Sequence, residues 1–377
     1  MKKLFFLINS LEGGGAERVV VNLASELSSA YDIDIITLKN INFYSLPKNV
    51  NFISLSNLEN NLLMFLLIPF YVFKFRKIIK KNKYINGISF LEISNFVNIL
   101  ANKKAIISFR INISFFKGII GFIYKLFIKI LYLKAVKIIV NSEENRFSLA
   151  NYLNYNINKI ITIYNPVNIE QININKNESL DNKFMSLIKT KKVFITVGRL
   201  VWQKNHITIL NSFKYIYDNV DKDFLYLIVG DGPKMNELVN YVKSNGLIDN
   251  VIFLGEQKNV FKYLNISNYF IYASEVEGFP NVLIEAMAIR LPIITSDFIS
   301  GAKECILGNY NNNLKNLNYP YYGENGVLLD LKNYESNFLN VYKNLDILKQ
   351  DKCGFEKFNF DSYLVKYNSI LQSNIKS

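Results

Sequence analysis

The sequence lacks the residues on which several classes of enzyme depend. Its 377 residues include a single histidine, His206, and only two cysteines, Cys305 and Cys353, which do not have the spacing of a metal site. Zinc centres built from histidine and cysteine, and Ser-His-Asp catalytic machinery, are therefore nearly excluded. The low cysteine content also argues against a disulfide framework and indicates a reducing compartment.

Long hydrophobic runs are missing as well. A membrane-spanning helix needs roughly 18 uninterrupted apolar residues. The longest candidates are 62–73, which is too short, and 119–133, which is interrupted by Lys125 and Lys129. The apolar stretch Leu4–Ile8 is too short for the core of a signal peptide, and we interpret it as a buried strand. We therefore expect a protein that is soluble or peripheral, located in the cytoplasm on the inner face of the cell membrane.

Acidic residues are scarce relative to basic ones. The chain has 44 Lys and Arg against 31 Asp and Glu, a formal net charge of +13. Such a balance favours contact with phosphates, nucleic acid or an acidic membrane surface. Residues 114–137 interleave aromatic side chains with lysines, and residues 70–83 have the same kind of pattern. A helix of this kind can lie in the headgroup region of an anionic membrane. The alternative is two ordinary amphipathic helices that cover a sheet.

Apolar strand patterns alternate with helical patterns along most of the chain, which predicts parallel sheets built from βαβ units. The expected strands are 3–8, 33–37, 87–89, 105–108, 137–141, 192–197, 224–229, 251–254, 269–272, 292–295 and 326–329. The Asn-, Lys- and Glu-rich sequence after Asn165-Pro166-Val167 separates two such series and indicates a linker. We predict two doubly wound α/β domains with ligands at the carboxyl ends of their strands.

The segment between Tyr272 and Asp297 carries the strongest functional signal. Glu277 and Glu285 flank the turn Gly278-Phe279-Pro280, and a helix of apolar and small residues follows. Proline is tolerated in the first helical turn, so the helix should begin near Pro280 or Asn281. Its N-terminal amides and dipole would attract an anion, while the two carboxylates could hold sugar hydroxyls. Alternatively, the segment is a surface helix with two solvated acids.

Three further turns follow predicted strands; the first two predict phosphate contacts, and the third is a turn by composition alone. Gly13, Gly14 and Gly15 precede Ala16-Glu17-Arg18 at the start of a helix, which permits close backbone approach to a phosphate. Gly198 ends a strand and leaves Arg199 and Lys204 at its carboxyl end, where two cations would stabilise a departing diphosphate. Gly230 lies in the turn Gly-Asp-Gly-Pro after the next strand.

These segments resemble the motifs of retaining, GT-B-fold glycosyltransferases of family four, the glycosyl transferases group 1. The resemblance is carried by GGAER at Gly14–Arg18, by Val197–His206 and above all by Glu277–Ala288. It implies two Rossmann-like domains facing a central cleft. It also implies an acceptor-binding domain over 1–167, a linker over 168–190, a nucleotide-sugar domain over 191–355, and a C-terminal helix within 356–377 that crosses back to the first domain.

The resemblance also assigns roles to residues. Glu277 would lie beside the transferred sugar and Glu285 would bind the ribose, while Arg199 and Lys204 would stabilise the departing diphosphate. The other expected donor-binding residues are Gly14, Gly15, Gly198, Gly230, Gly278, Phe279, Pro280 and Asn281. Glu17 and Arg110 are candidates for contact with the acceptor or the sugar; many relatives have a histidine near the position of Arg110. Alternatively, Arg110 is a surface arginine at the end of a strand.

The expected activity is retaining transfer of a sugar from a nucleotide-diphosphate donor, taken to be UDP-linked, to a cell-surface glycan precursor such as a polyprenyl-diphosphate-linked oligosaccharide. No cofactor or metal is expected. Asp32-Ile33-Asp34 has the form of a metal–nucleotide motif, but it opens an alternating strand, expected at a sheet edge, with no further ligands nearby. The alternatives are a UDP-sugar 2-epimerase of the same fold and a non-enzymatic, basic protein that binds membranes or nucleic acid. Nucleic acid is not an expected partner of the enzyme.

Overall fold

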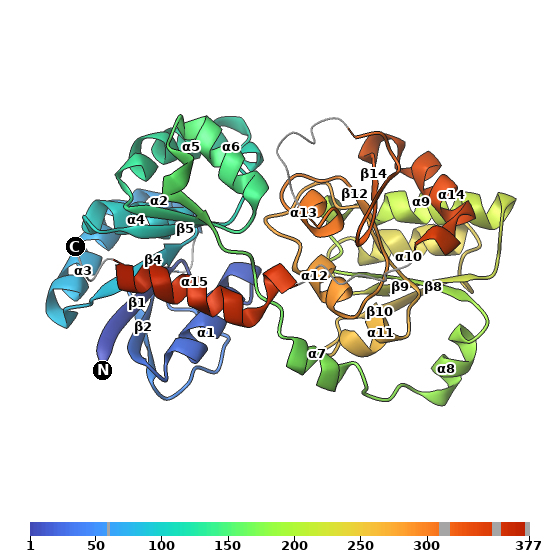
Figure 1. The fold of residues 1–377 in the computed structure, drawn as a ribbon, viewed down its shortest axis with the longest axis horizontal. Helices are drawn as coiled ribbons and strands as arrows, with labels where there is room; N and C mark the ends of the chain where they lie inside the picture. Colours follow the sequence, from blue (N-terminus) through green and yellow to red (C-terminus); the bar gives the residue numbers. More distant parts are fainter. Residues whose placement is uncertain (59–60, 309–316, 349–355, 374–377) are drawn as a thin grey trace. The chain divides into compact units, whose positions relative to one another are not determined.

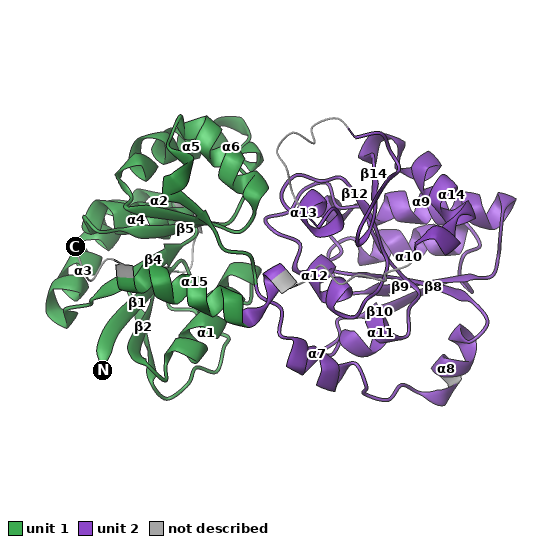
Figure 2. Cartoon of the chain, in the orientation of Figure 1, with its two compact units in different colours: residues 1–165, 361–377 green, residues 166–360 purple. Residues whose placement is uncertain are grey.

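The computed structural model describes residues 1–58, 61–308, 317–348 and 356–373. The chain forms two compact units (Figure 2): unit 1 comprises residues 1–165 and 361–377, and unit 2 comprises residues 166–360. Each unit has its own seven-stranded sheet with helices packed around it (Figure 1). The α/β class predicted from the alternating patterns is therefore confirmed.

The sheet of unit 1 is entirely parallel and has the strand order β3-β2-β1-β4-β5-β6-β7. Its strands are β1 (Lys2–Ile8), β2 (Tyr31–Thr37), β3 (Val50–Ser54), β4 (Asn86–Phe90), β5 (Ile106–Phe109), β6 (Lys137–Val140) and β7 (Ile160–Thr162). Its main helices are α1 (Gly15–Leu27), α2 (Asn61–Leu66), α3 (Ile68–Asn82), α4 (Glu92–Ala101), α5 (Gly118–Leu131), α6 (Glu143–Leu153) and α15 (Phe360–Ser373).

Alternation along the strands of unit 1 produces two hydrophobic layers. Leu4, Phe6 and Ile8 of β1 point to one face, where α1 and α15 cover the sheet. Phe5 and Leu7 point to the other face, where α3, α4 and α5 cover it. Successive side chains of a strand project to opposite faces, so a strand covered on both sides reads as a continuous apolar run. That is the pattern of KKLFFLI.

Unit 2 repeats this arrangement with the order β10-β9-β8-β11-β12-β14-β13, and only the edge strand β13 is antiparallel to its neighbour. Its strands are β8 (Lys192–Val197), β9 (Phe224–Val229), β10 (Val251–Gly255), β11 (Tyr269–Tyr272), β12 (Ile293–Ser296), β13 (Tyr321–Gly323) and β14 (Gly326–Leu329). Its main helices are α7 (Ile169–Asn175), α8 (Asn182–Ile188), α9 (His206–Asn219), α10 (Met235–Ser244), α11 (Phe261–Asn265), α12 (Asn281–Ala288), α13 (Ala302–Ile306) and α14 (Tyr334–Lys343).

The segment expected to be a linker, 168–190, contains the helices α7 and α8 and belongs to unit 2. Its asparagines have local structural roles. The side chain of Asn168 accepts a hydrogen bond from the backbone N–H of Gln171 and caps α7. The side chain of Asn175 accepts a hydrogen bond from the side-chain amide of Gln171 at 2.9 Å. Asparagine is a favoured helix cap, so a composition that resembles a linker can also start a helix.

The chain enters and leaves unit 2 along adjacent segments. The backbone N–H of Val167 donates to the Phe358 carbonyl at 2.9 Å, and Val167 pairs with Asn359 in a parallel bridge. The chain then continues into α15, which packs on the sheet of unit 1 through Tyr363, Tyr367, Ile370 and Leu371. Cys353 lies outside the described residues, and Cys305 is buried.

Asp32 and Asp34 do not lie on an edge strand, so that part of our expectation was wrong. Their strand, β2, is the second in the sheet and pairs with both β1 and β3. Both carboxylates contact the Lys3 ammonium, at 3.6 Å and 3.1 Å, and Asp34 also accepts hydrogen bonds from Asn51 and Tyr84. This is a structural ion-pair network.

Within the described part of the chain, no helix is long and apolar enough to cross a bilayer.

Candidate active site

The candidate donor site lies at the point of unit 2 where the strand order reverses. The strands β8 and β11 are neighbours, but the chain runs outward from β8 to β9 and β10 on one side, and from β11 to β12 on the other. The loops that leave such a pair diverge at the carboxyl edge, and ligands of doubly wound sheets bind there. Arg199 and Lys204 follow β8, and Glu277 follows β11.

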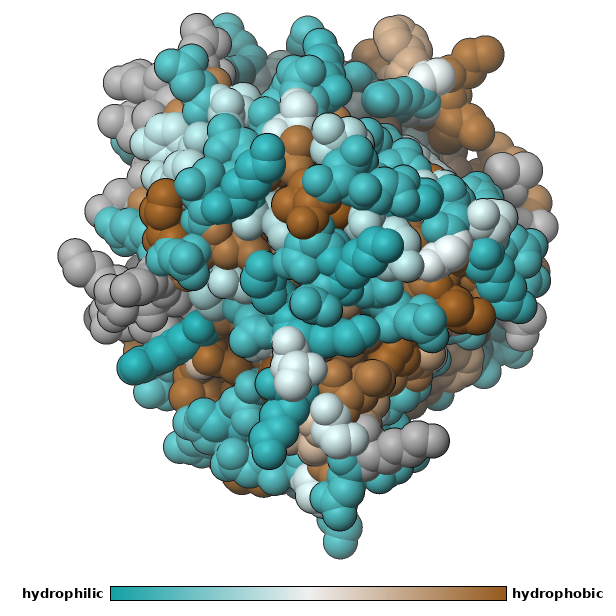
Figure 3. Space-filling model, turned by 90° about the vertical axis from the view of Figure 1, so that its right-hand side faces the viewer, coloured by the Kyte–Doolittle hydropathy of each residue, from teal (hydrophilic) through white to brown (hydrophobic). Residues whose placement is uncertain are grey.

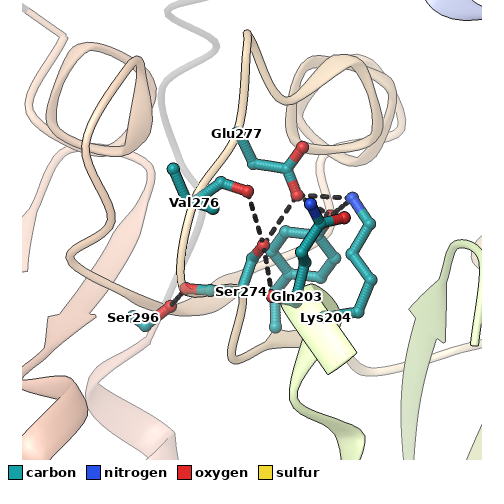
Figure 4. A network of polar contacts seen from close by, with 7 residues as sticks. Gln203, Lys204, Ser274, Val276, Glu277 and Ser296 are labelled. Atoms are coloured by element: carbon teal, nitrogen blue, oxygen red, sulfur yellow. Dashed lines mark hydrogen bonds and ion pairs between the residues drawn. The ribbon is translucent and has the colours of Figure 1, made fainter. Parts of the chain in front are cut away.

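Lys204 and Glu277 form an ion pair at this point (Figure 4). Lys204 ends a short 3-10 helix, Trp202–Lys204, and its Nζ atom contacts Oε1 of Glu277 directly. The same Nζ lies 2.5 Å from the Tyr272 hydroxyl. Only 19% of the Lys204 side chain and 14% of the Glu277 side chain are exposed. Two residues 73 positions apart in the sequence thus meet in a largely desolvated place.

Buried hydroxyl groups hold the Glu277 carboxylate in position. Tyr272 and Ser274 each donate a hydrogen bond to its Oε1 atom, both at 2.7 Å. The hydroxyl of Ser296 donates to the carbonyl of Ser274 at 2.7 Å, which ties this loop to β12. Burial, together with the negative charge of Glu277, raises the pKa of Tyr272 well above its usual value. Tyr272 therefore stays protonated and acts as a hydrogen-bond donor.

The second carboxylate oxygen of Glu277 has a different environment. All three donors contact Oε1, and Oε2 lies outside the network in Figure 4. Among the described residues, none donates a hydrogen bond to Oε2. The Lys204 side chain lies over Gly198, where an added Cβ atom would sit 3.6 Å from the lysine Cε atom. One oxygen of a rigidly held carboxylate thus remains available to a ligand hydroxyl.

The other candidate donor residues lie on the same sheet edge. Arg199 is exposed just beyond β8, and within the described chain its side chain forms no hydrogen bond or ion pair. The predicted helix start is confirmed, because α12 begins at Asn281 directly after Pro280 and has no side-chain cap. Glu285 is half-buried within α12. The convergence of Arg199 and Glu285 with the Lys204–Glu277 pair on one ligand stays a prediction.

The first turn of α12 is less open to an anion than the sequence suggested. The backbone N–H groups of Asn281 and Leu283 donate to the carbonyls of Phe279 and Pro280, at 3.1 Å and 3.0 Å. Phe279 is buried and packs against Phe358, with 5.8 Å between ring centroids. The predicted row of free amides is therefore only partly free. The Gly278 carbonyl accepts a hydrogen bond from the Ser300 hydroxyl at 2.6 Å.

Gly230 has a structural reason to be glycine. It has a φ of +133°, and a Cβ atom there would lie 2.0 Å from the carbonyl oxygen of Gly198. A contact that short is impossible, so any side chain would force apart the turns that follow β8 and β9. This packing requirement is sufficient to explain why the residue is glycine, and no ligand contact is needed to explain it. Contact of Gly230 with the donor stays a prediction.

Unit 1 brings together the glycine loop, Glu17 and Arg110. Gly14 immediately precedes α1, and the carboxylate of Glu17 curls back over it, so that a Cβ on Gly14 would lie 2.3 Å from Oε2 of Glu17. Burial raises the pKa of Glu17, and the nearby Arg110 charge opposes this rise. Arg110 is only 7% exposed and donates to the side chains of Ser108 and Asn165. It is a buried cation beside an acid, and not a surface arginine.

Glu92 is a candidate that the sequence did not single out. It follows β4, which pairs with β1 at the strand-order reversal of unit 1, just as Glu277 follows β11 in unit 2. Leu91, the residue before it, has a φ of +69°, a strained conformation for a bulky side chain. The Oε1 atom of Glu92 is fully enclosed and has no hydrogen-bond partner. Strain collects at functional sites, so Glu92 joins the candidate residues of unit 1. An acid directly after a strand was the available signal.

The buried carboxyl of Glu92 predicts a pH-dependent stability. Burial raises its pKa from 4.5 to about 7. The folded protein therefore holds this proton more tightly than the unfolded chain does. The resulting stabilisation is fully present below about pH 4.5 and is lost as the pH rises through about 7. Glu92→Gln mimics the protonated form and should raise the free energy of unfolding by on the order of 2 kcal/mol at pH 8. Its effect at pH 5 should be much smaller. Urea unfolding at both pH values measures this, and equal effects at the two would contradict the assignment.

Comparison with known proteins identifies the family to which this chain belongs. The family model described as Glycosyltransferase Family 4 matches residues 13–171, and the one described as Glycosyl transferases group 1 matches residues 179–320. The chain is 30% identical over 314 residues to the N-acetylgalactosamine-N,N'-diacetylbacillosaminyl-diphospho-undecaprenol 4-alpha-N-acetylgalactosaminyltransferase of Campylobacter jejuni. That alignment covers 81% of this chain and 83% of the relative. The chain belongs to glycosyltransferase family 4.

Other relatives support the same assignment. An uncharacterised glycosyltransferase of Methanocaldococcus jannaschii is 35% identical over 215 residues, which are 57% of this chain and 52% of that protein's length. Among solved structures, the Anabaena protein HepE in complex with UDP superposes with a TM-score of 0.72 at 14% identity, covering 99% of this chain and all of that one. This likeness concerns the fold, and the GT-B fold expected of this glycosyltransferase is confirmed.

Proposed function

We propose that this family 4 glycosyltransferase transfers a sugar from a UDP-linked donor, with retention of anomeric configuration, to a polyprenyl-diphosphate-linked glycan precursor. The bond between the anomeric carbon and the diphosphate oxygen breaks, and a bond from that carbon to an acceptor hydroxyl oxygen forms on the same face. The acceptor proton leaves with the diphosphate. No metal or cofactor takes part in the proposal.

The Lys204–Glu277 pair is the observation that carries this proposal. An ammonium group beside the leaving diphosphate stabilises the negative charge that develops as the sugar bond breaks. The carboxylate, fixed through Oε1 by Tyr272 and Ser274, leaves Oε2 for a hydroxyl of the transferred sugar. The site is largely desolvated, which strengthens both interactions. Arg199 would supply a second cation to the diphosphate, and Glu285 would bind the ribose.

The donor and acceptor classes are inferred from the named relatives. The Campylobacter relative is named for transfer to a sugar on diphospho-undecaprenol, and HepE binds UDP in its structure. The diphosphate of such an acceptor would add a second anion for Arg110 and the glycine loop of unit 1. Because a polyprenyl chain anchors its sugar in the membrane, we place the reaction at the inner face of the cell membrane.

A nucleotide-sugar screen tests the proposal. Purified protein is mixed with UDP, GDP, UDP-glucose, UDP-galactose, UDP-N-acetylglucosamine and UDP-N-acetylgalactosamine, with and without EDTA, and thermal unfolding is recorded. A ligand present at 100 times its Kd stabilises by about 2.7 kcal/mol. For a domain of this size that corresponds to a rise in Tm of roughly 5–10 °C.

The expected pattern is that UDP sugars raise Tm more than GDP does, and that EDTA makes no difference. Stabilisation by GDP alone would overturn the UDP assignment, and loss of the shift in EDTA would overturn metal independence. Stabilisation by duplex DNA or another polyanion, with no response to any nucleotide sugar, would instead support a non-enzymatic basic protein. Conversion of UDP-N-acetylglucosamine to its 2-epimer without any acceptor would support the epimerase.

A further inference from the structure

The helix α5 of unit 1 has two apolar faces, and only one of them is covered. Ile128 and Leu131 are buried in the core beneath the sheet, and Tyr124 and Phe127 pack against it. The opposite face carries exposed residues at alternating spacings of four and three, which forms one continuous line on a helix. These residues, named here the α5 stripe, are Ile119, Ile123, Leu126 and Ile130 of α5 and Leu133 of the 3-10 helix Tyr132–Lys134 that follows it.

The α5 stripe is exposed to an unusual extent for large hydrophobic side chains. Ile119 is 83% exposed and Ile130 53%, and Phe122, beside the stripe, is 67% exposed. The neighbouring helix α2 contacts the covered side of α5, where its Phe65 packs on Phe127 with ring centroids 5.0 Å apart. Leu63 and Leu66 of α2 are also exposed. A single exposed leucine needs no explanation, but a contiguous apolar patch marks an interaction site.

In unit 1, Phe70 and Phe73 of α3 are exposed as well, but among the described residues of unit 2 the exposed hydrophobic side chains do not form such a line. In unit 2 they come from separate elements, for example Trp202, Ile248 and Ile347. Figure 3 looks onto the side of unit 2, where hydrophobic residues form separate groups among hydrophilic ones. The α5 stripe is therefore not a general property of this surface.

The charge around the α5 stripe has one sign. Lys117 and Lys134 lie at its two ends, and Lys125 and Lys129 follow one border. Between residues 60 and 142 the sequence holds 14 Lys and Arg, and Glu92 is its only acid. The Oε1 atom of that one acid is enclosed. A complementary partner therefore offers an apolar region to the α5 stripe and negative charges to the surrounding lysines. An acidic lipid bilayer, with its acyl chains and anionic headgroups, has this chemistry.

We propose that the α5 stripe is a lipid-binding surface, with α5 lying in the plane of an anionic membrane and its lysines at the phosphate groups. The stripe spans about 21 Å at 1.5 Å per residue, which suits a helix that lies in the interface. A second copy of the chain is the rival occupant, since the spacing also fits a helix–helix seam. A two-fold pairing would place the lysines of one copy against those of the other, and this repulsion favours the membrane.

Vesicle flotation tests this proposal with the full-length protein. Vesicles of phosphatidylglycerol and phosphatidylcholine are compared with vesicles of phosphatidylcholine alone, at low and high salt. The test variant is Ile119→Glu/Ile130→Glu, which changes two exposed positions. The matched control is Ile174→Glu/Ile248→Glu, which places the same charges at exposed isoleucines of unit 2. Size-exclusion chromatography with light scattering is run on all three proteins.

The wild-type protein and the control should float with the anionic vesicles, and the stripe variant should lose at least tenfold in vesicle partition. High salt should weaken binding without abolishing it, because the apolar contact is not screened. Absence of wild-type flotation, or equal flotation of the stripe variant, overturns the proposal. A dimer that only the stripe variant breaks, without a change in flotation, assigns the surface to a second copy.

The lipid-binding surface rests on the proposed function, since an enzyme with a lipid-linked acceptor has to work at a membrane. The two proposals can nevertheless be tested separately. The stripe variant should keep the thermal shift with a UDP sugar, because it changes none of the candidate donor residues, which lie in unit 2 and in the glycine loop of unit 1. Loss of vesicle binding with an unchanged donor response therefore reports on the membrane surface alone.

Discussion

Glu277→Gln is expected to lower sugar transfer about 100- to 1000-fold. The carboxylate is held through Oε1 by Lys204, Tyr272 and Ser274, all of which are donors in this geometry. An amide cannot neutralise Lys204. Its NH2 group either faces these donors or replaces the acceptor oxygen proposed for the sugar hydroxyl. Loss of a charge-assisted contact of this kind in a desolvated site costs roughly 3–4 kcal/mol in the transition state. The measurement is kcat with the donor and acceptor identified by the screen.

Glu275→Gln is the matched control for this variant. Glu275 lies two positions earlier on the same loop, is exposed, and contributes its backbone N–H to the Gln203 carbonyl at 2.8 Å, which the substitution leaves intact. It should keep wild-type kcat and Tm. Thermal unfolding of both variants separates lost chemistry from lost folding. If Glu277→Gln stays within threefold of wild-type activity, the proposed role of this carboxylate is wrong.

Lys204→Met and Arg199→Met are expected to differ in stability while both slow transfer. In the proposed mechanism each removes one cation from the departing diphosphate, so kcat should fall about 100-fold for either, with a smaller change in donor KM. Lys204→Met also leaves Glu277 buried without its counterion, which should destabilise the free protein by about 3 kcal/mol. Arg199 is exposed and makes no such contact in the described chain, so Arg199→Met should leave Tm unchanged.

A double-mutant cycle between Lys204→Met and Glu277→Gln makes this prediction sharper. Residues in direct contact are not additive, so the double variant should lose less stability than the sum of the single variants. Arg199→Met combined with Glu277→Gln should be close to additive in stability. Lys214→Met, which removes a surface lysine paired with Asp218 on α9, is the control for the loss of one positive charge. An unchanged kcat in Arg199→Met would remove that residue from the mechanism.

Most strands were predictable, and those that were missed share one property. The patterns predicted the interior strands of both sheets, and the edge strand β10, to within a residue or two. Interior strands are buried on both faces and consist of consecutive apolar residues. The three missed strands, β3, β7 and β13, all lie at sheet edges. Two of them have three residues each, and most residues of β3 and β13 are partly exposed. A short strand with one neighbour carries too little apolar sequence to be recognised.

The residues of the candidate site also fall into those that the sequence predicted and those that it did not. Local motifs identified Glu277, Lys204 and the start of α12, because turns, glycines and helix caps depend on residues close together in the sequence. They did not identify Tyr272 and Ser274 as the donors that hold Glu277, although these lie only five and three positions before it, because the path of the loop decides which side chains meet. Ser296 was missed because it lies on the neighbouring strand β12. Glu92 was missed because its position matters only in the assembled sheet. An acid directly after a strand was a local signal, but the strand-order reversal between β1 and β4 that gives it meaning is a property of the sheet.

The sequence by itself determined the fold class, the family resemblance and the basic charge of residues 60–142, since each follows from residue types and their spacing. Only the tertiary structure decided which groups are desolvated: that Arg110 is buried beside Glu17, that one oxygen of Glu277 is saturated while the other stays open, and that α5 exposes a second apolar face. Burial is a property of packing between segments distant in the chain. The same Lys-Leu-Phe-Ile pattern can cover a sheet or face solvent, and the neighbouring elements determine which.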